Sequence, residues 1–399
     1  MQTRTVSLFV IVLVGLGTVM AQELTPIEKL GKALFFDKNL SLHKNQSCAS
    51  CHAPEVGWTG PDEAINKGGG VYEASVIDKY GNRKPPSSAY ATPAMKFKMI
   101  TKGEFIGGNF WDGRATGEVL GSPAADQAQG PFLNPLEQAI PNAKILVEKV
   151  AASNYADLFK QIYGANAFAV VETAYGNIGR AIAAYEASAE VNQFSSKFDA
   201  YLAGKAKLSA QEQNGLVLFE GKAKCANCHT SKPGPKGQPP LFTDFTYDNL
   251  GFPRNPDNPF YYERDVNPLG AAWIDGGLGG YLAETTHYQS YAKENLGKHK
   301  VPTLRNVDKR PRPDFVKAFG HNGFFKSLKA VVHFYNTRDK LPVCVNDLTK
   351  AGIDCWPPAE VGQNINDEEL GNLDLTDQEE DDIVVFLQTL SDGYMTLKK

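Results

Sequence analysis

Two short cysteine–histidine motifs offer the most specific chemistry in this sequence. Cys48–His52 reads CASCH, and Cys225–His229 reads CANCH. In such a motif two thiols can add to the vinyl groups of a haem while the adjacent imidazole binds the iron. Structural zinc would not require a histidine beside each pair, and a redox dithiol would not require two copies. The motifs therefore predict two covalently attached c-type haems, held by Cys48, Cys51, His52, Cys225, Cys228 and His229.

The amino-terminal residues predict export. Arg4 precedes an apolar run over Val6–Met20, and small residues end at Ala21. These features are typical of a secretory signal cleaved after Ala21. An uncleaved anchor is the alternative, but an apolar run of about 15 residues is shorter than the roughly 20 that span a bilayer. We expect a signal peptide over 1–21 and a soluble periplasmic protein.

Length and charge exclude several classes of protein. The chain has 399 residues, is 42% hydrophobic and carries a formal charge of −4. This balance excludes a polytopic membrane protein and a disordered chain. No basic stripe favours nucleic acid, so no nucleic-acid partner is expected. A chain of this length predicts two domains of ordinary size.

Related helical segments precede the two motifs. Leu30–Phe36 and Asn214–Glu220 share the pattern G-x-x-L-F, which predicts an amphipathic helix packed against each haem. We therefore expect a mainly α fold of two cytochrome c-like domains, 22–192 and 193–399, with long ordered loops. A helix is expected between the motifs over Glu172–Glu190.

Further elements are expected in the carboxyl-terminal half. Ser231–Pro302 has little periodicity, which predicts a long ordered loop over the second haem. Ser327 can cap a helix, and a second capped helix should begin at Thr376. Cys344 and Cys355 are expected to form a disulfide in the oxidising periplasm, with a reactive thiol pair as the alternative.

Several ordered motifs cover essentially the whole mature chain. Besides the two CxxCH units they are FWDGR at Phe110–Arg114, QAQGP at Gln127–Pro131, NPLE at Asn134–Glu137, VPTLRN at Val301–Asn306, GHNG at Gly320–Gly323 and HFYN at His333–Asn336. With these motifs the chain resembles the bacterial dihaem cytochrome c peroxidase and MauG superfamily. The resemblance implies one haem that binds peroxide and a second that handles electrons.

The resemblance also implies roles for individual residues. Trp111 matches the tryptophan between the haems, and Gln127 and Glu137 match the pair beside the peroxide. A carboxylate in a partly dry pocket can transfer the proton that O–O cleavage requires. The alternatives are an ordinary core aromatic for Trp111, a surface residue for Gln127 and a helix-start acid for Glu137.

Two departures place the chain on the MauG-like branch. No histidine occurs between His52 and His229, so the first haem should be open to peroxide without reductive activation. No methionine occurs from Leu304 to Phe386. Tyr335 matches the position of the tyrosine ligand of MauG-like members. Helical periodicity places Tyr335 on the same face as the apolar side chains of Leu328, Val331 and Val332. The alternatives are a core tyrosine and iron bound by His333, which points away from that face.

Other polar residues receive simpler interpretations. The family's calcium ligand is an asparagine, and Lys84 stands in its place, so bound calcium is doubtful. His321 is expected to be structural or to contact a propionate. Surface positions are expected for His43, His287 and His299.

The expected function is a dihaem peroxidase-type oxidoreductase. In the MauG-like interpretation it reacts with hydrogen peroxide and stores high-valent iron to oxidise Trp or Tyr side chains of a protein partner. Tyrosinate opposite His229 would favour such iron. The first alternative is a conventional cytochrome c peroxidase that takes electrons from a small cytochrome or cupredoxin. The second is a dihaem cytochrome that only transfers electrons.

Overall fold

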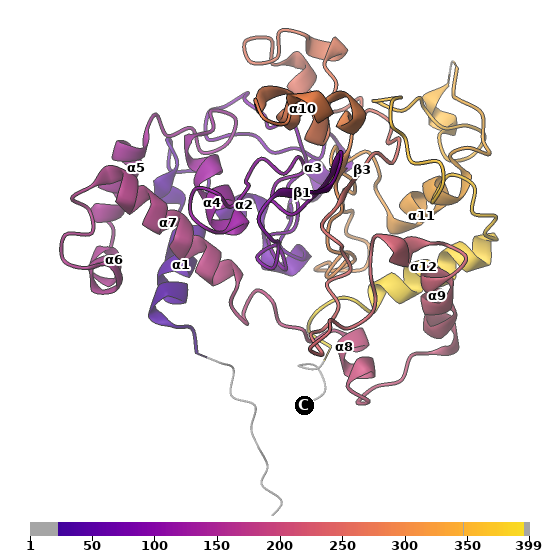
Figure 1. Ribbon diagram of the computed structural model, residues 1–399, viewed down its shortest axis with the longest axis horizontal. Helices are drawn as coiled ribbons and strands as arrows, with labels where there is room; N and C mark the ends of the chain where they lie inside the picture. The colour runs from indigo at the N-terminus through magenta and orange to yellow at the C-terminus, as the bar shows by residue number, and fades with distance from the viewer. Residues whose placement is uncertain (1–22, 346, 395–399) are drawn as a thin grey trace, which may run out of the picture.

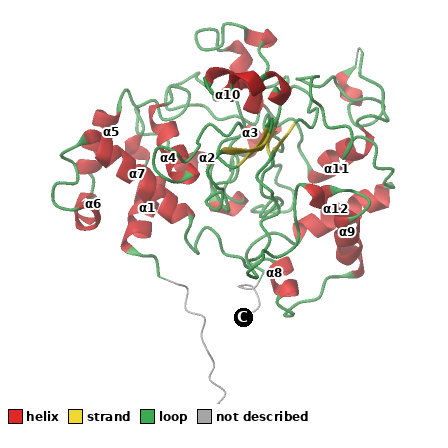
Figure 2. Cartoon of the chain, in the orientation of Figure 1, coloured by secondary structure: helices red, strands yellow, loops and turns green. Residues whose placement is uncertain are grey.

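The computed structural model describes residues 23–345 and 347–394, and the expected signal peptide lies outside them. The fold is mainly helical, with long connecting loops and two small antiparallel sheets (Figure 2). The helices are α1 (Pro26–Phe36), α2 (Cys48–Cys51), α3 (Glu63–Lys67), α4 (Pro123–Leu133), α5 (Ala143–Ala151), α6 (Ala156–Tyr163), α7 (Val171–Glu186), α8 (Lys197–Leu202), α9 (Ala210–Glu220), α10 (Gly277–Glu284), α11 (Leu328–Thr337) and α12 (Asp377–Gln388). The strands are β1 (Lys98–Thr101), β2 (Glu104–Ile106), β3 (Tyr247–Asp248) and β4 (His299–Lys300).

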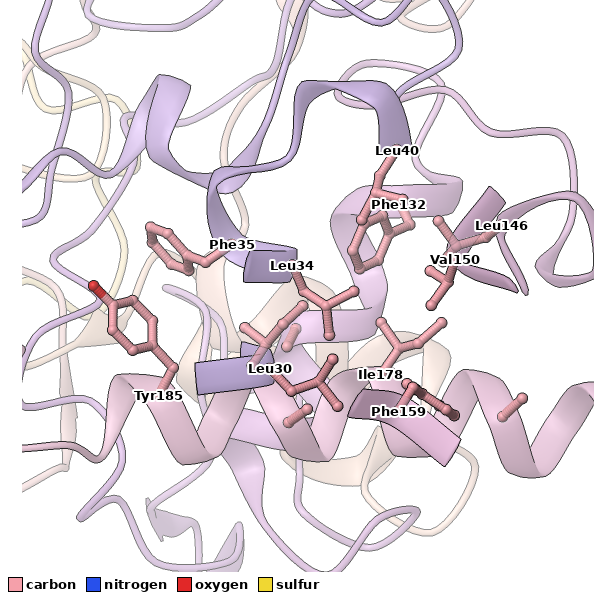
Figure 3. Close-up of a cluster of buried hydrophobic side chains, with 14 of the residues drawn as sticks. Leu30, Leu34, Phe35, Leu40, Phe132, Leu146, Val150, Phe159, Ile178 and Tyr185 are labelled. Carbon is pink, nitrogen blue, oxygen red and sulfur yellow. The ribbon is translucent and has the colours of Figure 1, made fainter. Parts of the chain in front are cut away.

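Two separate hydrophobic cores lie on opposite sides of the molecule (Figure 1). One is built around α1, α4, α5, α6 and α7, and Figure 3 shows its tightly packed side chains. Its larger members include Leu30, Leu34, Phe35, Phe132, Leu146, Phe159, Ile178 and Tyr185. The other core is built around α9, α11 and α12, with Phe219, Phe242, Phe334 and Phe386. We keep the domain boundary near 193 as a proposal.

The two halves use the same helix crossing. A Cβ atom on Gly31 of α1 would lie 1.9 Å from the carbonyl oxygen of Ala181 in α7. A Cβ atom on Gly215 of α9 would lie 2.0 Å from the carbonyl oxygen of Asp382 in α12. Both glycines belong to the shared G-x-x-L-F pattern, and each lets two helix backbones meet at van der Waals distance. The repeated pattern therefore encodes a repeated helix crossing, in which the first helix precedes a CxxCH unit and its partner helix comes later in the chain.

Helix caps confirm most of the expected helix starts. Thr376 and Glu379 form a capping box at α12, and the Ser327 hydroxyl accepts from the backbone nitrogen of Ala330 at α11. The expected helix over Glu172–Glu190 is shorter, because α7 ends at Glu186. Beyond that residue the chain turns toward the second half of the molecule, so residues with helix propensity form the connecting segment instead of a longer helix.

The expectation of a loop over Ser231–Pro302 is only partly correct. This segment contains α10 and the paired strands β3 and β4, and α10 lies at the top of the view in Figure 1. Three of the eight residues of α10 are glycine, so helix propensity does not predict this helix. Leu278 and Leu282 are nevertheless fully buried against Phe105 of β2, so tertiary packing forms this helix.

Two further observations complete the fold. Cys344 and Cys355 form a disulfide, as the sequence predicts. Over the described part of the chain, no helix has the length and apolarity needed to cross a membrane.

Candidate functional site

Two cavities lie in the interior, one beside each CxxCH unit. The first has a volume of about 260 Å³, and Cys51 and His52 line it. The second has a volume of about 190 Å³, and Cys225, Cys228 and His229 line it. Cys48 begins the helical turn α2 that carries Cys51. Each cavity therefore offers thiols and an imidazole from one short segment.

The histidines of both motifs are held in the same way. His52 Nδ1 lies 3.2 Å from the Trp58 carbonyl oxygen, and His229 Nδ1 lies 2.8 Å from that of Phe242. Because a carbonyl oxygen only accepts hydrogen bonds, each Nδ1 carries the proton and each Nε2 keeps its lone pair. Burial lowers the pKa of His52 to about 4 and also lowers the pKa of His229. Both rings are thus neutral, which suits iron ligation and fits one haem in each cavity.

The first cavity collects the residues expected beside the peroxide. Gln127 of α4 and Glu137 both line it, together with Arg114. Asn134 donates from Nδ2 to Glu137 Oε2 at 3.0 Å, which fixes the carboxyl orientation. Burial raises the pKa of Glu137 above its ordinary value, although Asn134 and Arg114 oppose the change. A buried carboxyl group whose pKa is raised is a better proton acceptor than an exposed one and can return the proton to a nearby oxygen.

Trp111 lies between the cavities, because it lines both of them. Its indole Nε1 donates to the carbonyl oxygen of Lys84 at 2.8 Å. The backbone of Lys300 in β4 donates to the Trp111 carbonyl oxygen at 2.8 Å. One hydrogen bond thus fixes the indole and the other fixes the backbone of Trp111.

The second cavity receives the predicted face of α11. Leu328, Val331, Val332 and Tyr335 all line it. His333 points elsewhere, and its Nδ1 lies 2.9 Å from Glu380 Oε1. Burial raises the pKa of Tyr335, so its phenol keeps its proton unless a cation approaches. The helical phase deduced from the sequence is confirmed.

The Lys84 ammonium is buried near the first cavity. Its Nζ donates to Thr59 Oγ1 at 2.8 Å and to the Pro85 carbonyl oxygen at 2.9 Å. A cation already bound to these oxygens disfavours calcium at the same place. The expectation of doubtful calcium stays a prediction.

Sequence reasoning missed two features. Glu186, the last residue of α7, is 5% exposed and lines the first cavity, far along the chain from its other lining residues. The surface position expected for His299 is wrong, because its side chain is 10% exposed and stacks on His321. Both placements depend on contacts between distant segments, which no local pattern signals. His43 and His287 are exposed, as expected.

Comparisons with known proteins agree with this geometry. A family model described as di-haem cytochrome c peroxidase matches residues 26–207. The chain is 32% identical to methylamine utilization protein MauG of Paracoccus denitrificans, over 91% of this chain and 88% of that protein. It is 29% identical to cytochrome-c peroxidase IdrP1 of Denitromonas iodatirespirans, over 91% of this chain and 80% of that protein. The solved structure of the diheme peroxidase BthA of Burkholderia thailandensis superposes with a TM-score of 0.73 at 29% identity, over 94% of this chain and 91% of that one.

Proposed function

Because the chain belongs to the di-haem cytochrome c peroxidase family, we propose that its two cavities are the sites of a MauG-like reaction with hydrogen peroxide. As in its family, the protein is an oxidoreductase that uses peroxide and two c-type haems. Cys48 and Cys51 would hold the first haem with His52 as ligand. Cys225 and Cys228 would hold the second, with the ligands His229 and Tyr335. Bound in this way, the haems supply the iron that reacts with peroxide and the iron that stores an oxidising equivalent.

The proposed task of Glu137 is proton transfer in the first cavity. Its carboxylate takes the proton from one peroxide oxygen and returns it to the other, which leaves as water. Gln127, on the same cavity wall, orients the peroxide through its amide. Arg114 stabilises the ionised form of Glu137, which is present before the first transfer and after the second.

Tyr335 is the observation that favours the MauG-like interpretation. It lines the second cavity on the face of α11 that the sequence predicts, and among the residues that the structure describes no methionine lines that cavity. An anionic oxygen ligand favours ferric and more oxidised iron over ferrous iron. Trp111, which lines both cavities, would carry electrons between the haems. A protein partner would then be oxidised at the surface, and we propose export to the periplasm as the setting.

The experiment compares two uses of peroxide by the diferric protein. One equivalent of peroxide should change the haem absorbance at once, whereas a reduced small cytochrome c should be oxidised only slowly. Rapid oxidation of two cytochromes per peroxide would instead support conventional cytochrome c peroxidase activity, which the similarity to IdrP1 keeps as the second candidate.

A further inference from the structure

Two histidines and an aspartate form a buried cluster that the proposed reaction does not use. The imidazoles of His299 and His321 stack with their centroids 3.6 Å apart and an interplanar angle of 10°. Asp275 precedes α10, and its Oδ2 lies 3.3 Å from His299 Nε2. Each of the three side chains offers a ligand atom within 4.8 Å of the others.

Both imidazoles have a buried nitrogen without a hydrogen-bond partner. These atoms are Nε2 of His299 and Nε2 of His321. His299 Nδ1 donates to the Gly297 carbonyl oxygen at 3.0 Å, so Nε2 of the neutral ring presents a lone pair. That lone pair faces the oxygen of Asp275, and two buried acceptors without a proton between them are unfavourable. A bound cation would satisfy both.

The carboxylates around the pair favour a cation over an anion. Arg83 donates from Nε and Nη2 to the two oxygens of Asp275, each at 2.6 Å, which fixes the carboxylate. A carboxylate oxygen has a second lone pair, so Oδ2 can still bind a metal. Glu360 Oε2 lies 3.8 Å from His321 Nε2.

We propose that Asp275, His299 and His321 bind one divalent transition-metal ion, for which zinc is the probe. Two imidazoles and one carboxylate with an open fourth position are a recurrent zinc donor set. Zinc bonds of about 2.0–2.2 Å place tetrahedral ligand atoms roughly 3.3 Å apart. The ligand atoms here lie within 4.8 Å of one another, so binding requires side-chain rotation that tilts the stacked imidazole rings apart until their lone pairs converge. Both histidines line the second cavity, so the metal would bind beside the site proposed for the second haem.

A metal ion bound at this site would affect Trp111, which lies between the two cavities. The ring of His321 meets Trp111 edge to face, with centroids 6.4 Å apart. A divalent charge bound to His321 disfavours the cation radical of the neighbouring Trp111, so bound metal should make oxidation of the indole harder.

The test is a metal count on the holoprotein. Protein with both haems is stripped with a chelator, equilibrated with zinc and freed of loose metal, and zinc and iron are then counted by mass spectrometry. Wild-type protein should retain about one zinc per two irons. His299→Gln and His321→Gln should each bind zinc at least roughly 100-fold more weakly, because even residues behind metal ligands contribute 10- to 100-fold.

The matched control is His287→Gln, because that histidine is exposed and outside the cluster. It should keep the wild-type zinc content. Anomalous scattering from zinc-soaked wild-type crystals gives an independent answer that does not depend on variant folding. Wild-type protein that retains no zinc, or zinc that survives both substitutions, overturns the proposal. A shift of the haem spectrum in the variants without any zinc in the wild type would assign the pair to the haem instead.

Discussion

Substitution of Glu186 by glutamine should stabilise the protein at high pH and leave its stability at low pH almost unchanged. Glu186 is buried at the end of α7, and burial raises its pKa from 4.5 to about 8. Among the residues that the structure describes, none forms an ion pair or hydrogen bond with its carboxyl group. The folded state therefore holds a proton that the unfolded state releases, and the acid should be neutral in the folded protein at pH 7.

The sign and the size of the effect follow from this pKa. Since folding raises the pKa of Glu186, the contribution of its carboxyl group to stability is fully present below pH 4.5 and is lost as the pH rises toward about 8. The loss has an upper limit of roughly 5 kcal/mol, because one pKa unit corresponds to about 1.4 kcal/mol. Water entering the cavity reduces it, so we expect a few kcal/mol at pH 9. Glutamine has nearly the same shape and no charge, and should recover this energy.

The assay is guanidinium unfolding of the holoprotein at pH 5 and pH 9. The difference in unfolding free energy between Glu186→Gln and wild type should be small at pH 5 and should favour the variant by about a few kcal/mol at pH 9. Glu148→Gln is the control, because Glu148 lies on α5 with its side chain 63% exposed. An equal difference for Glu186→Gln at both pH values would refute the reasoning.

Three further predictions concern the other sites. Glu137→Gln should slow the reaction with peroxide by a factor of roughly 10²–10⁴ while both haems stay attached, as measured by stopped-flow absorbance. If the variant reacts as fast as the wild type, Glu137 does not transfer the proton. The wild-type rate should also rise with pH through a pKa above that of an ordinary glutamate, because the carboxylate must first accept a proton, and this dependence should vanish in the variant. Tyr335→Phe should convert the second haem from six- to five-coordinate in electron paramagnetic resonance, whereas His333→Gln should leave its signal unchanged; the opposite pattern would assign the ligand to His333. Replacement of both Cys344 and Cys355 by serine should lower the free energy of unfolding, measured by chemical denaturation, by roughly 2–4 kcal/mol. An unchanged free energy would show that the disulfide does not stabilise the folded protein.

The sequence by itself determined the features that depend on neighbours along the chain. The CxxCH units, the caps at Ser327 and Thr376 and the phase of α11 all follow from local spacing, because helical geometry fixes which side chains share a face. The resemblance directed attention to Glu137 and Trp111, but only the fold places them beside the cavities.

Only the tertiary structure decided which distant segments share a site. Glu186 reaches the first cavity because α7 crosses α1 at Gly31, and nothing around Glu186 in the chain signals its burial. His299 lies in the short strand β4 and His321 lies in the GHNG loop, and they meet only after β4 pairs with β3 and the GHNG loop folds beside it. Burial and the approach of other charges set the pKa of such groups, and both quantities are sums over residues far apart in sequence. Local pattern therefore predicted where chemistry could occur, and packing determined which side chains surround it.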